Sequence, residues 1–306
     1  MVEIAAVDVA ELDGLVAVRN AVVRSDPATA EGLIDWRQQA EDMTWLVATE
    51  DDRPVGAGIG IVGWHTSPGT AYVEAWTLPE ARGHGIGEQL YRELMRWAAD
   101  RGCAAVETAV AEDDQASLAW ADQRGFREVG RNSRLVLDLG TIEAPAIEPP
   151  PGIEITSWAE RPGIEHQLYA VYAESEPDIP GEEHNALPSF EHWLDHDMRG
   201  LSDRPEAVFV ALAGDDVVGY AKLSLPSSTS REAYHDLTAV ARAWRRRGIA
   251  GALKRSQIAW AKRCGYARLV TTNEARNEPI RRLNEGHGYR VEPGSVVLRT
   301  TIASID

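Results

Sequence analysis

The hydrophobic pattern of the chain predicts the same succession of elements twice. Each half begins with a short apolar strand and an acid-rich helical region, continues with three strands, a glycine-bearing turn and a long helix, and ends with a strand, a short helix and a last strand. Elements in this order predict an α/β (α+β) fold, with helices on the faces of a mixed sheet. The predicted strands are 2–6, 45–49, 55–62, 71–78, 105–109 and 135–139, then 153–157, 208–213, 217–225, 234–240, 268–272 and 296–300.

The long helix after the glycine-bearing turn has the clearest periodicity. It is predicted at 85–101 in the first half and at 248–263 in the second. Gly102 and Gly265 come directly after these helices, where glycine is favoured as a C-terminal cap. In the first half the apolar side chains recur at the 3.6-residue period, at Ile86, Leu90, Leu94 and Trp97. One face of this helix is therefore expected to pack on the sheet.

An internal repeat accounts for the double succession. Identical or similar residues lie 163 positions apart from about residue 46 to 126, as do Gly85 and Gly248, or Trp97 and Trp260. At the amino-terminal edge of each copy the offset is 151, so the second copy carries 12 extra residues. A fixed offset of this length indicates two copies of one structural unit.

A proline-rich segment separates the two copies. Residues 144–152 contain four prolines and a glycine, a composition typical of a stiff, extended linker. The sequence therefore predicts a first domain at 1–143, a linker at 144–152 and a second domain at 153–306. The extra residues of the second copy fall around 175–183, which is rich in Glu, Asp and Pro.

Composition and charge narrow the function classes. The 306 residues carry 31 Lys and Arg against 48 Asp and Glu, which gives a net charge of −17. Such a field repels phosphate backbones and anionic membrane surfaces, so we expect no nucleic-acid and no membrane partner. No run of 18 apolar residues predicts a transmembrane helix, and the first four residues do not resemble a secretory leader.

Cysteine and histidine usage predicts no metal site. The two cysteines, Cys103 and Cys264, lack zinc-binding spacing and are typical of a reducing, cytoplasmic setting. His192 and His196 have an i,i+4 spacing that could hold a metal, but an amphipathic acidic helix explains the pair without one. We therefore expect a cytoplasmic protein with no metal.

The candidate chemistry lies in the glycine-bearing turn before the long helix. Small residues at 82–87 and 245–250 would let a ligand approach the backbone, and the N–H groups of a helix N-terminus favour an anion such as phosphate. Neither turn has the GxGxxG of a dinucleotide fold or the GK[ST] of a P-loop. From Arg242 to Arg255 there are six basic residues and no acidic one. This run is either a solvated charge cluster or, as we favour, the site of a small polyanionic ligand.

These turns resemble the signature of the GNAT superfamily of acetyl-coenzyme-A-dependent N-acetyltransferases. The pattern [QR]xxGx[GA] is matched in both copies, by Arg82-x-x-Gly85-x-Gly87 and by Arg245-x-x-Gly248-x-Ala250. Three further features are similar to the family, namely the lead-in 78–83, the Gly-aromatic pairs Gly125-Phe126 and Gly288-Tyr289, and Asn277-x-Pro279. Tandem members are known, so the resemblance implies two GNAT-like domains, each a mostly antiparallel mixed sheet with helices on both faces.

The resemblance also implies where acetyl-CoA would bind as substrate. Backbone N–H groups of the two turns would hold the pyrophosphate, and the pantetheine would pair with strand edges at 75–78 and 238–240, where the fourth and fifth strands splay apart. A backbone N–H there would polarise the thioester carbonyl. The implied coenzyme-binding residues are Thr77, Leu78, Arg82, Gly83, His84, Gly85, Ile86 and Gly87 in the first copy, and Ala239, Val240, Arg245, Arg246, Arg247, Gly248, Ile249, Ala250, Asn277 and Asn284 in the second.

The catalytic base differs between the copies. The family often uses a glutamate on the fourth strand, and Glu74 has this position in the first copy, whereas Leu237 has it in the second. The second copy would need His235 or Asp236, and strand alternation places His235 on the face of Leu237 and Asp236 on the other. Glu74 and His235 could equally be ordinary surface residues.

The family's usual acid is missing from both copies. It is a tyrosine four residues before the Gly-aromatic pair, and Ala121 and Asn284 stand there. Neither side chain can protonate a thiolate, so solvent would serve or the copies are partly degenerate. The first copy also has Asp114 where the second has Asn277, and a carboxylate is unhelpful near coenzyme A. The second copy is favoured as the working site.

We therefore hypothesise that the protein transfers an acetyl group to a primary amine, and we keep two alternative functions. The segments 72–76 and 97–98 are similar to aminoglycoside-type acetyltransferases, but this short resemblance does not fix the acceptor. A small-molecule amine is the leading expectation, and a protein or peptide N-terminus is an alternative. The acidic insertion at 175–183 suggests that the acceptor is a cation. In the alternatives, one or both domains bind acetyl-CoA without catalysis, or the turns bind a nucleotide. The oligomeric state is expected to be a monomer or a homodimer.

Overall fold

The computed structural model describes residues 2–23, 27–63, 66–180, 187–225 and 231–302, and it divides into two compact units. Unit 1 comprises residues 1–129 and 296–306, and unit 2 comprises residues 130–295. Within the described ranges, no helix is both long and apolar enough to cross a membrane.

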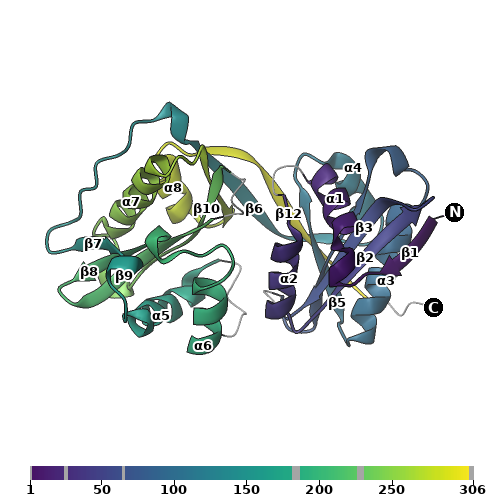
Figure 1. Ribbon diagram of the computed structural model, residues 1–306, viewed down its shortest axis with the longest axis horizontal. Helices are drawn as coiled ribbons and strands as arrows, with labels where there is room; N and C mark the ends of the chain where they lie inside the picture. Colours follow the sequence, from purple (N-terminus) through teal and green to yellow (C-terminus); the bar gives the residue numbers. More distant parts are fainter. Residues whose placement is uncertain (1, 24–26, 64–65, 181–186, 226–230, 303–306) are drawn as a thin grey trace. The chain divides into compact units, whose positions relative to one another are not determined.

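Unit 1 is built on a mixed sheet in the order β1-β2-β3-β4-β5-β12 (Figure 1). The first four strands pair antiparallel, while β4 and β5 pair parallel. The predicted mostly antiparallel mixed sheet is therefore confirmed. Its strands are β1 (Val2–Ala6), β2 (Asp42–Glu50), β3 (Arg53–Val62), β4 (Thr70–Thr77), β5 (Ala105–Ala111) and the end of β12 (Arg290–Thr301).

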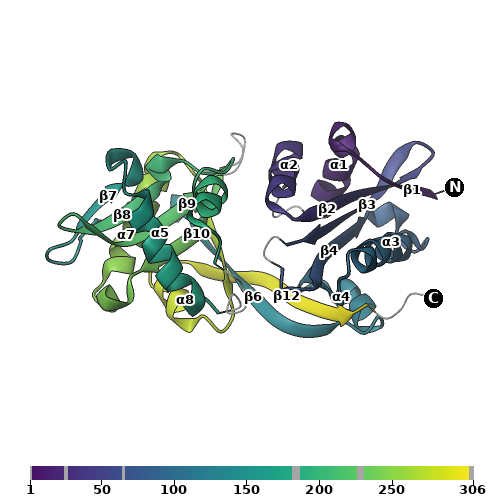
Figure 2. The same cartoon turned by 90° about the horizontal axis from the view of Figure 1, so that it is seen from below.

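Helices cover both faces of the unit 1 sheet, as Figure 2 shows. On one face lie α1 (Leu12–Val22) and α2 (Ala30–Gln39), and on the other lie α3 (Ile86–Asp100) and α4 (Gln115–Asp122). The strand residues alternate between two apolar layers. One layer packs Leu12, Leu15, Val18 and Leu33 on Trp45, Val47, Ile59 and Trp76, and the other packs Ile86, Leu90 and Leu94 on Leu46, Ala48 and Val73.

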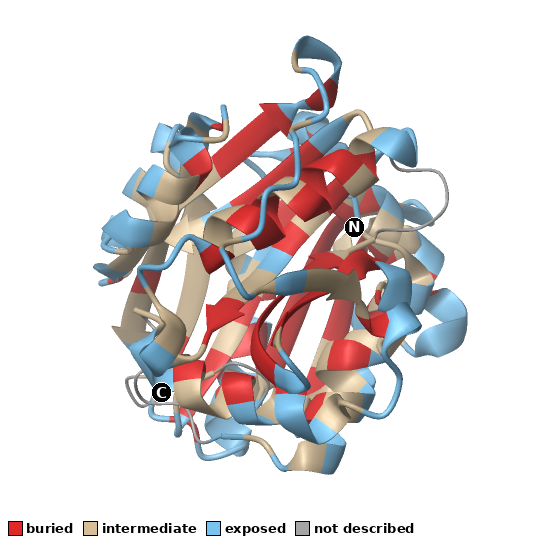
Figure 3. Cartoon of the chain, turned by 90° about the vertical axis from the view of Figure 1, so that its left-hand side faces the viewer, coloured by how far each residue is buried: buried red, intermediate tan, exposed pale blue. Residues whose placement is uncertain are grey.

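Unit 2 repeats this architecture in the order β6-β11-β10-β9-β8-β7. One layer is formed with α5 and α6, and the other with α7, so that the strands are buried between helices (Figure 3). The elements are β6 (Arg127–Asp138), β7 (Glu154–Ser157), β8 (Val208–Ala213), β9 (Asp216–Ser224), β10 (Glu232–Val240), β11 (Arg268–Glu274), α5 (Glu165–Ser175), α6 (Phe190–Trp193), α7 (Ile249–Arg263) and α8 (Glu278–Glu285).

The parallel strands of each unit pair over three residues only. In unit 2 the pairing of β10 with β11 runs from 232 to 234 on β10, and in unit 1 that of β4 with β5 runs from 70 to 72 on β4. Beyond these residues the two strands separate and leave an opening in the sheet. In unit 2 a β-bulge between His235 and Leu237 lies directly after the last paired residue, whereas the register of β4 against β3 is unbroken. Such a bulge re-aims the side chains on either side of it.

The boundaries of the units differ from the predicted domains at the final strands. Residues 130–143, predicted in the first domain, belong to unit 2, and 296–306, predicted in the second, belong to unit 1. The reason is hydrogen bonding. Residues 132–138 of β6 pair antiparallel with β11, and the Ile302 N–H donates to the Ala104 carbonyl in unit 1. Each repeat therefore contributes its last strand to the sheet of the other repeat.

Gly219 on β9 lies where the backbone of the neighbouring strand β10 leaves no room for a Cβ. A Cβ at this position would lie 2.9 Å from the Ala239 carbonyl oxygen and 3.5 Å from Ile249, the first residue of α7. Since the contact is with backbone, relief would require the strand itself to move. At the equivalent Gly56 in unit 1, a Cβ would lie 2.9 Å from the Ile86 side chain and 3.2 Å from the Trp76 carbonyl oxygen.

We therefore expect Gly219→Ala to destabilise the protein by ~1–3 kcal/mol, the usual cost of overpacking a core. Gly87→Ala is the matched control, because a Cβ there meets nothing closer than 3.5 Å and unit 2 itself has Ala250 at this position. Urea denaturation followed by circular dichroism measures both. Equal stability of the two variants would contradict the close-packing account.

Candidate functional site

The turn before α7 has the backbone conformation of an anion-binding loop. Gly248 caps the helix at φ +85°, and Arg246 two residues earlier has φ +61°. In unit 1 the equivalent Gly83 and Gly85 have φ values of +81° and +80°. No side chain caps the first turn of α7, so its N–H groups are available to a ligand. A side chain in the left-handed region costs ~1–2 kcal/mol, and unit 2 bears that strain at an arginine.

The first arginine of each motif ties its turn to the preceding strand. Arg245 Nε donates to the Val240 carbonyl at 2.8 Å, and Arg82 Nε donates to the Thr77 carbonyl at 3.2 Å. Both guanidinium groups thus hold the end of a strand and the start of a helix at a fixed distance. The arginine predicted to bind coenzyme in each turn is therefore also what positions the backbone N–H groups.

Asp178 neutralises two of the six basic residues that the sequence presents without an acidic neighbour. Arg242 donates to both carboxylate oxygens at 2.9 Å, and Arg245 donates to one at 2.7 Å. The hydrogen bonds from Arg242 and then from Arg245 lower the pKa of Asp178 to about 2. Residues 242–255 therefore include no acidic residue in the sequence, but in the fold the Asp178 carboxylate contacts two of their arginines. Asp178 belongs to the insertion predicted to attract a cationic acceptor; 181–183 of that insertion lie outside the described residues.

A groove beside this turn remains positively charged. It lies between the start of α7 and the end of α8, and its walls include Arg246, Arg247 and Gly251 on one side and Leu283 and His287 on the other. Arg246 and Arg247 are exposed, and neither makes an ion pair within the described part of the chain.

The linker forms a further wall of the same groove. Glu148 and Pro150 line it, and Arg255 on α7 donates to the Glu148 carbonyl at 2.9 Å. Pro150 would lie 3.7 Å from a Cβ added at Gly248. A bulky side chain at Gly248 would therefore enter the groove as well as strain the turn.

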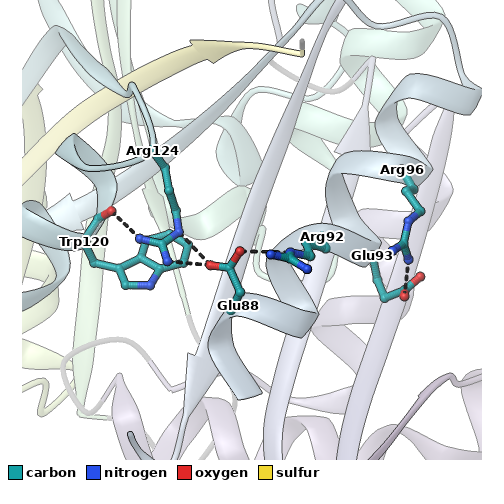
Figure 4. A network of polar contacts seen from close by, with 6 residues as sticks. All are labelled: Glu88, Arg92, Glu93, Arg96, Trp120 and Arg124. Atoms are coloured by element: carbon teal, nitrogen blue, oxygen red, sulfur yellow. Dashed lines mark hydrogen bonds and ion pairs between the residues drawn. The ribbon is translucent and has the colours of Figure 1, made fainter. Parts of the chain in front are cut away.

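In unit 1 the corresponding space is bridged by an ion-pair network, which Figure 4 shows. Glu88, in the first turn of α3, accepts from Arg124 Nε at 2.8 Å and from Arg92 Nε at 3.0 Å. Arg124 also stacks 3.7 Å from the centre of the Trp120 ring and donates to the Trp120 carbonyl. These contacts join α3 to the end of α4.

Glu88 changes the electrostatics of the unit 1 turn. Although burial favours its protonated form, hydrogen bonds from Arg124 and Arg92 lower the pKa of Glu88, so it is an anion at neutral pH. It already occupies the positive end of α3, where a phosphate would otherwise be attracted. Its equivalent in unit 2 is Gly251, and that of Arg124 is His287. The two units therefore differ where a phosphate would bind.

The predicted base of unit 1 lies on the α1–α2 face of the sheet. Glu74 is half-buried on β4 and accepts a hydrogen bond from the Tyr72 hydroxyl at 2.7 Å. The side chain of Trp76 is on the same face and stacks with the buried Arg19, whose Cζ is 5.6 Å from the ring centre. Burial and the neighbouring Glu74 raise the pKa of Tyr72 well above its ordinary value.

The bulge in β10 places His235 and Asp236 differently from the prediction. Alternation predicted His235 on the face of Leu237, and this is wrong, because the register shifts between the two residues. Leu237 packs in the α5–α6 layer, whereas His235 is buried beside Tyr289, in contact with residues of α7. Asp236 is 46% exposed and accepts from Lys222 at 2.6 Å and from Ser224 at 3.1 Å.

Lys222 connects Asp236 to the α5–α6 side of unit 2. Its buried ammonium also pairs with Asp203 at 3.0 Å and donates to the Asp197 carbonyl. Burial opposes the charge of Lys222, but Asp236 and Asp203 raise the pKa of Lys222 above its ordinary value. Of the two predicted bases of unit 2, only Asp236 is therefore connected to the α5–α6 side.

A cluster of buried polar side chains under α7 escaped the sequence analysis. Lys254 and Gln257 project from α7, His235 from β10, and Asn284 from α8, and the Tyr289 hydroxyl shares a hydrogen bond with His235 Nε2. Comparison of the two copies could have revealed this cluster, because Tyr91 and Leu94 of the first copy stand at the positions of Lys254 and Gln257.

The remaining predicted coenzyme residues fall into distinct environments. Ile86 and Ile249 are buried, so only their backbone can meet a ligand. Asn277 caps α8 without a side-chain hydrogen bond in the cap, whereas Asn284 is fully buried and donates to Asn273 at 3.0 Å. Residues 82–85, His84 among them, and residues 245–248 lie on the loops before the helices, whereas Gly87 and Ala250 are in the first turns of α3 and α7.

Two remaining expectations concern Asp114 and the histidine pair. Asp114 caps α4, and although burial favours its protonated form, hydrogen bonds from Ser117 lower the pKa of Asp114. His192 and His196 have their ring centres 4.5 Å apart. No group of three or more potential metal ligands occurs in the described part of the chain.

The burial of the Lys254 amine leads us to expect an unusual dependence of protein stability on pH. Burial lowers its pKa from the ordinary 10.5 to about 7, so the unfolded chain binds more protons between these two values. The contribution of Lys254 to the free energy of unfolding is therefore lowest below pH 7 and increases as pH rises towards 10.5. We expect Lys254→Leu to raise the free energy of unfolding, most at or below pH 7 and progressively less up to pH 10.5.

Thermal unfolding of both proteins across pH 6 to 10 measures this difference. Arg263→Leu, on the exposed end of the same helix, is the control and should shift the melting temperature equally at every pH. A Lys254→Leu effect that does not change with pH would contradict the lowered pKa of this buried amine.

Comparison with known sequences identifies the repeated unit. The sequence model of the acetyltransferase (GNAT) family matches the chain twice, over residues 15–126 and 165–289. A protein of Bacillus subtilis (strain 168), "Putative phosphinothricin acetyltransferase YwnH", is 26% identical over 131 residues, which are 39% of this chain and 80% of that protein.

Solved structures share the fold over the whole chain. A GCN5-related N-acetyltransferase from Sphaerobacter thermophilus has a TM-score of 0.78 at 22% identity, with 100% of this chain and 97% of that chain covered. A tandem GNAT protein from the clavulanic acid biosynthesis pathway, solved without AcCoA, has a TM-score of 0.81 at 18% identity, with both chains fully covered. At these identities the likeness shows the fold alone. Because the family model covers most of the chain in two matches, this protein belongs to the acetyltransferase (GNAT) family and is an N-acetyltransferase with two GNAT repeats in tandem.

Proposed function

We propose that the protein transfers the acetyl group of acetyl-CoA to a primary amine of a small molecule, and that unit 2 binds the coenzyme. The observation that carries the assignment is the contrast at the start of the two long helices. Gly251 leaves the groove of unit 2 open beside Arg246 and Arg247, whereas Glu88 and Arg124 bridge the same place in unit 1.

The residues of unit 2 fit a pyrophosphate. Gly248 and Arg246 hold the turn in the left-handed conformation that exposes successive N–H groups, and Arg245 fixes that turn to Val240. Two exposed arginines offset the repulsion that a chain of net charge −17 would exert on a polyanion. Acetyl-CoA, the cosubstrate of the family, supplies the activated thioester.

Asp236 is the residue proposed to accept a proton from the acceptor ammonium. It lies on the bulge at the opening between β10 and β11, and its exposure leaves it accessible from the α5–α6 side. Lys222 and Ser224 orient the carboxylate through the same oxygen, Oδ2. His235 is a weaker candidate, because burial lowers its pKa well below the ordinary value and its Nε2 is engaged by Tyr289.

Unit 1 is proposed to be a module without coenzyme turnover. Its turn retains the backbone of the family, but the anion at the N-terminus of α3 is its own Glu88. Glu74 is held by Tyr72 in a layer that also contains Trp76 and Arg19. This supports a structural role for the first repeat.

The coenzyme assignment predicts one acetyl-CoA site per chain. Gly248→Val should weaken binding at least ~10-fold, which corresponds to the loss of ~1.4 kcal/mol of binding energy, because it strains the turn and fills space towards Pro150. Gly85→Val makes the equivalent change in unit 1 and should leave affinity and stoichiometry unchanged. Isothermal titration calorimetry with acetyl-CoA measures both. Two sites in the wild type, or loss of binding in Gly85→Val alone, would overturn the assignment.

The transfer itself is tested by release of free thiol from acetyl-CoA in the presence of a panel of primary amines. We expect at least one small amine to accelerate release in the wild type. Asp236→Asn should lower kcat by ~100-fold or more, the usual contribution of a general base, and Glu74→Gln should leave it unchanged. Thiol release that no amine accelerates, from a protein that binds acetyl-CoA, would favour the non-catalytic alternative.

A further inference from the structure

The opening between β10 and β11 is lined by polar side chains on its α7–α8 side. Pairing of the two strands ends at Tyr234 and Val270, and the next residues are held by side chains instead. Thr271 Oγ1 donates to the His235 carbonyl at 3.2 Å, and Asn284 Nδ2 donates to Asn273 Oδ1 at 3.0 Å. The opening therefore lies directly beside the cluster of Lys254, Gln257, His235, Asn284 and Tyr289.

Lys254 is the cation of this cluster. It lies about one and a half turns into α7, is 1% exposed, and its ammonium is 5.7 Å from the centre of the Tyr289 ring. No carboxylate pairs with it among the residues that the structure describes. Burying an unpaired ammonium is costly, and such a cost persists where the group has a use.

The neighbours of Lys254 also have unused hydrogen-bonding capacity. Among the described residues around Lys254, four buried atoms make no hydrogen bond of good geometry, namely His235 Nδ1, Gln257 Oε1 and Nε2, and Asn284 Oδ1, although His235 and Gln257 lie close enough to interact with each other. Buried polar groups are ordinarily satisfied, so several orphans in one place indicate that a polar ligand completes the site. In unit 1 the equivalent positions are Tyr72, Tyr91, Leu94, Ala121 and Phe126, none of which carries an amide, an imidazole or an ammonium group. The cluster is therefore a feature of unit 2 alone.

Thioester cleavage requires a proton at this place. The leaving coenzyme is a thiolate, and the tyrosine that the family uses to protonate it is replaced by Asn284. We propose that the ammonium of Lys254 protonates the coenzyme thiolate in unit 2. This inference rests on the proposed function of that unit.

The step balances in atoms and charge. As the amine nitrogen bonds to the acetyl carbon, the carbon–sulfur bond breaks and its electron pair stays on sulfur. One N–H bond of Lys254 breaks, an S–H bond forms, and Lys254 becomes a neutral amine that regains its proton from solvent. The acceptor ammonium loses two protons in becoming the amide, so one proton is released to solvent per turnover.

The surroundings of Lys254 suit a group that both gives and regains a proton near neutral pH. The titratable and charged side chains around it are His235 from β10, His287 and Tyr289 from the segment after α8, and Arg255 from α7. Burial lowers the pKa of Lys254 to about 7, lowers those of His235 and His287, and raises that of Tyr289. Lys254 is thus the neighbour whose proton is labile at pH 7.

A binding experiment tests the contact without any acceptor. An ammonium beside the sulfur lowers the pKa of the thiol of bound coenzyme A, which the ultraviolet absorbance of the thiolate reports in a pH titration. Lys254→Met should raise that thiol pKa by about 1 to 3 units, the usual influence of an opposite charge at contact. Arg263→Met, at the exposed end of α7, is the control and should leave it unchanged. An unchanged thiol pKa in Lys254→Met would overturn the proposal.

Measurements of turnover then distinguish proton donation by Lys254 from a purely electrostatic effect of its charge. Lys254→Met should lower kcat ~100-fold with KM for acetyl-CoA unchanged, and should abolish the decline of kcat as pH rises through 7. Lys254→Arg keeps the charge but cannot release a proton at these pH values, so it should retain the low thiol pKa and still turn over slowly. Full activity of Lys254→Arg would overturn proton donation. Failure of the wild type to bind coenzyme A would instead overturn the proposed function.

Discussion

The short parallel pairing in each sheet is the constraint on which the rest of the site depends. The two central strands of unit 2 pair over three residues and then separate, and a bulge between His235 and Leu237 follows directly on β10. An opening in a sheet exposes backbone N–H and C=O groups that need partners. A ligand with an extended amide chain can supply them. The turn that ends β10, fixed by Arg245 to Val240, then delivers the N-terminus of α7 to the same ligand.

The two repeats show how one backbone can be kept while its chemistry is changed. Both turns have left-handed residues at the same two positions, and both first arginines donate to the last carbonyl of the preceding strand. The differences are in side chains around that frame. Unit 1 uses Glu88 and Arg124 to join α3 to α4, and unit 2 has Gly251 and His287 there. The backbone of the turns does not distinguish the units, whereas the electrostatics around the turns do.

Much of the fold follows from local patterns in the sequence. The 163-residue offset and the 3.6-residue period of the long helix depend on short-range preferences, and the elements they predict are present. The glycine turns were found because a left-handed residue before a helix strongly favours glycine. The sequence predicted the last strand of each repeat, but it did not predict which sheet each of these strands joins. Pairing of β6 with β11 is a long-range hydrogen-bonding choice that no local pattern of apolar residues expresses.

The site could be predicted only in part, for reasons that particular residues make clear. Alternation failed at His235 because a bulge adds one residue to a strand and reverses every face after it. The arginine run was correctly connected to the turn, but Asp178 reaches it from 64 residues away in the chain. The sequence presents Lys254 as one charge in a basic helix, because its burial beside the Tyr289 ring depends on residues distant in the chain.

The sequence by itself determined the repeated architecture, the glycine-bearing turns before the long helices and the resemblance to the acetyltransferases, because these depend on periodicity and on backbone conformations that few residues tolerate. Tertiary structure decided which charges remain free, which faces His235 and Asp236 occupy, and that Lys254 is buried. Those properties depend on contacts between residues distant in the chain, where the energy of a charge is set by its surroundings and not by its neighbours in sequence.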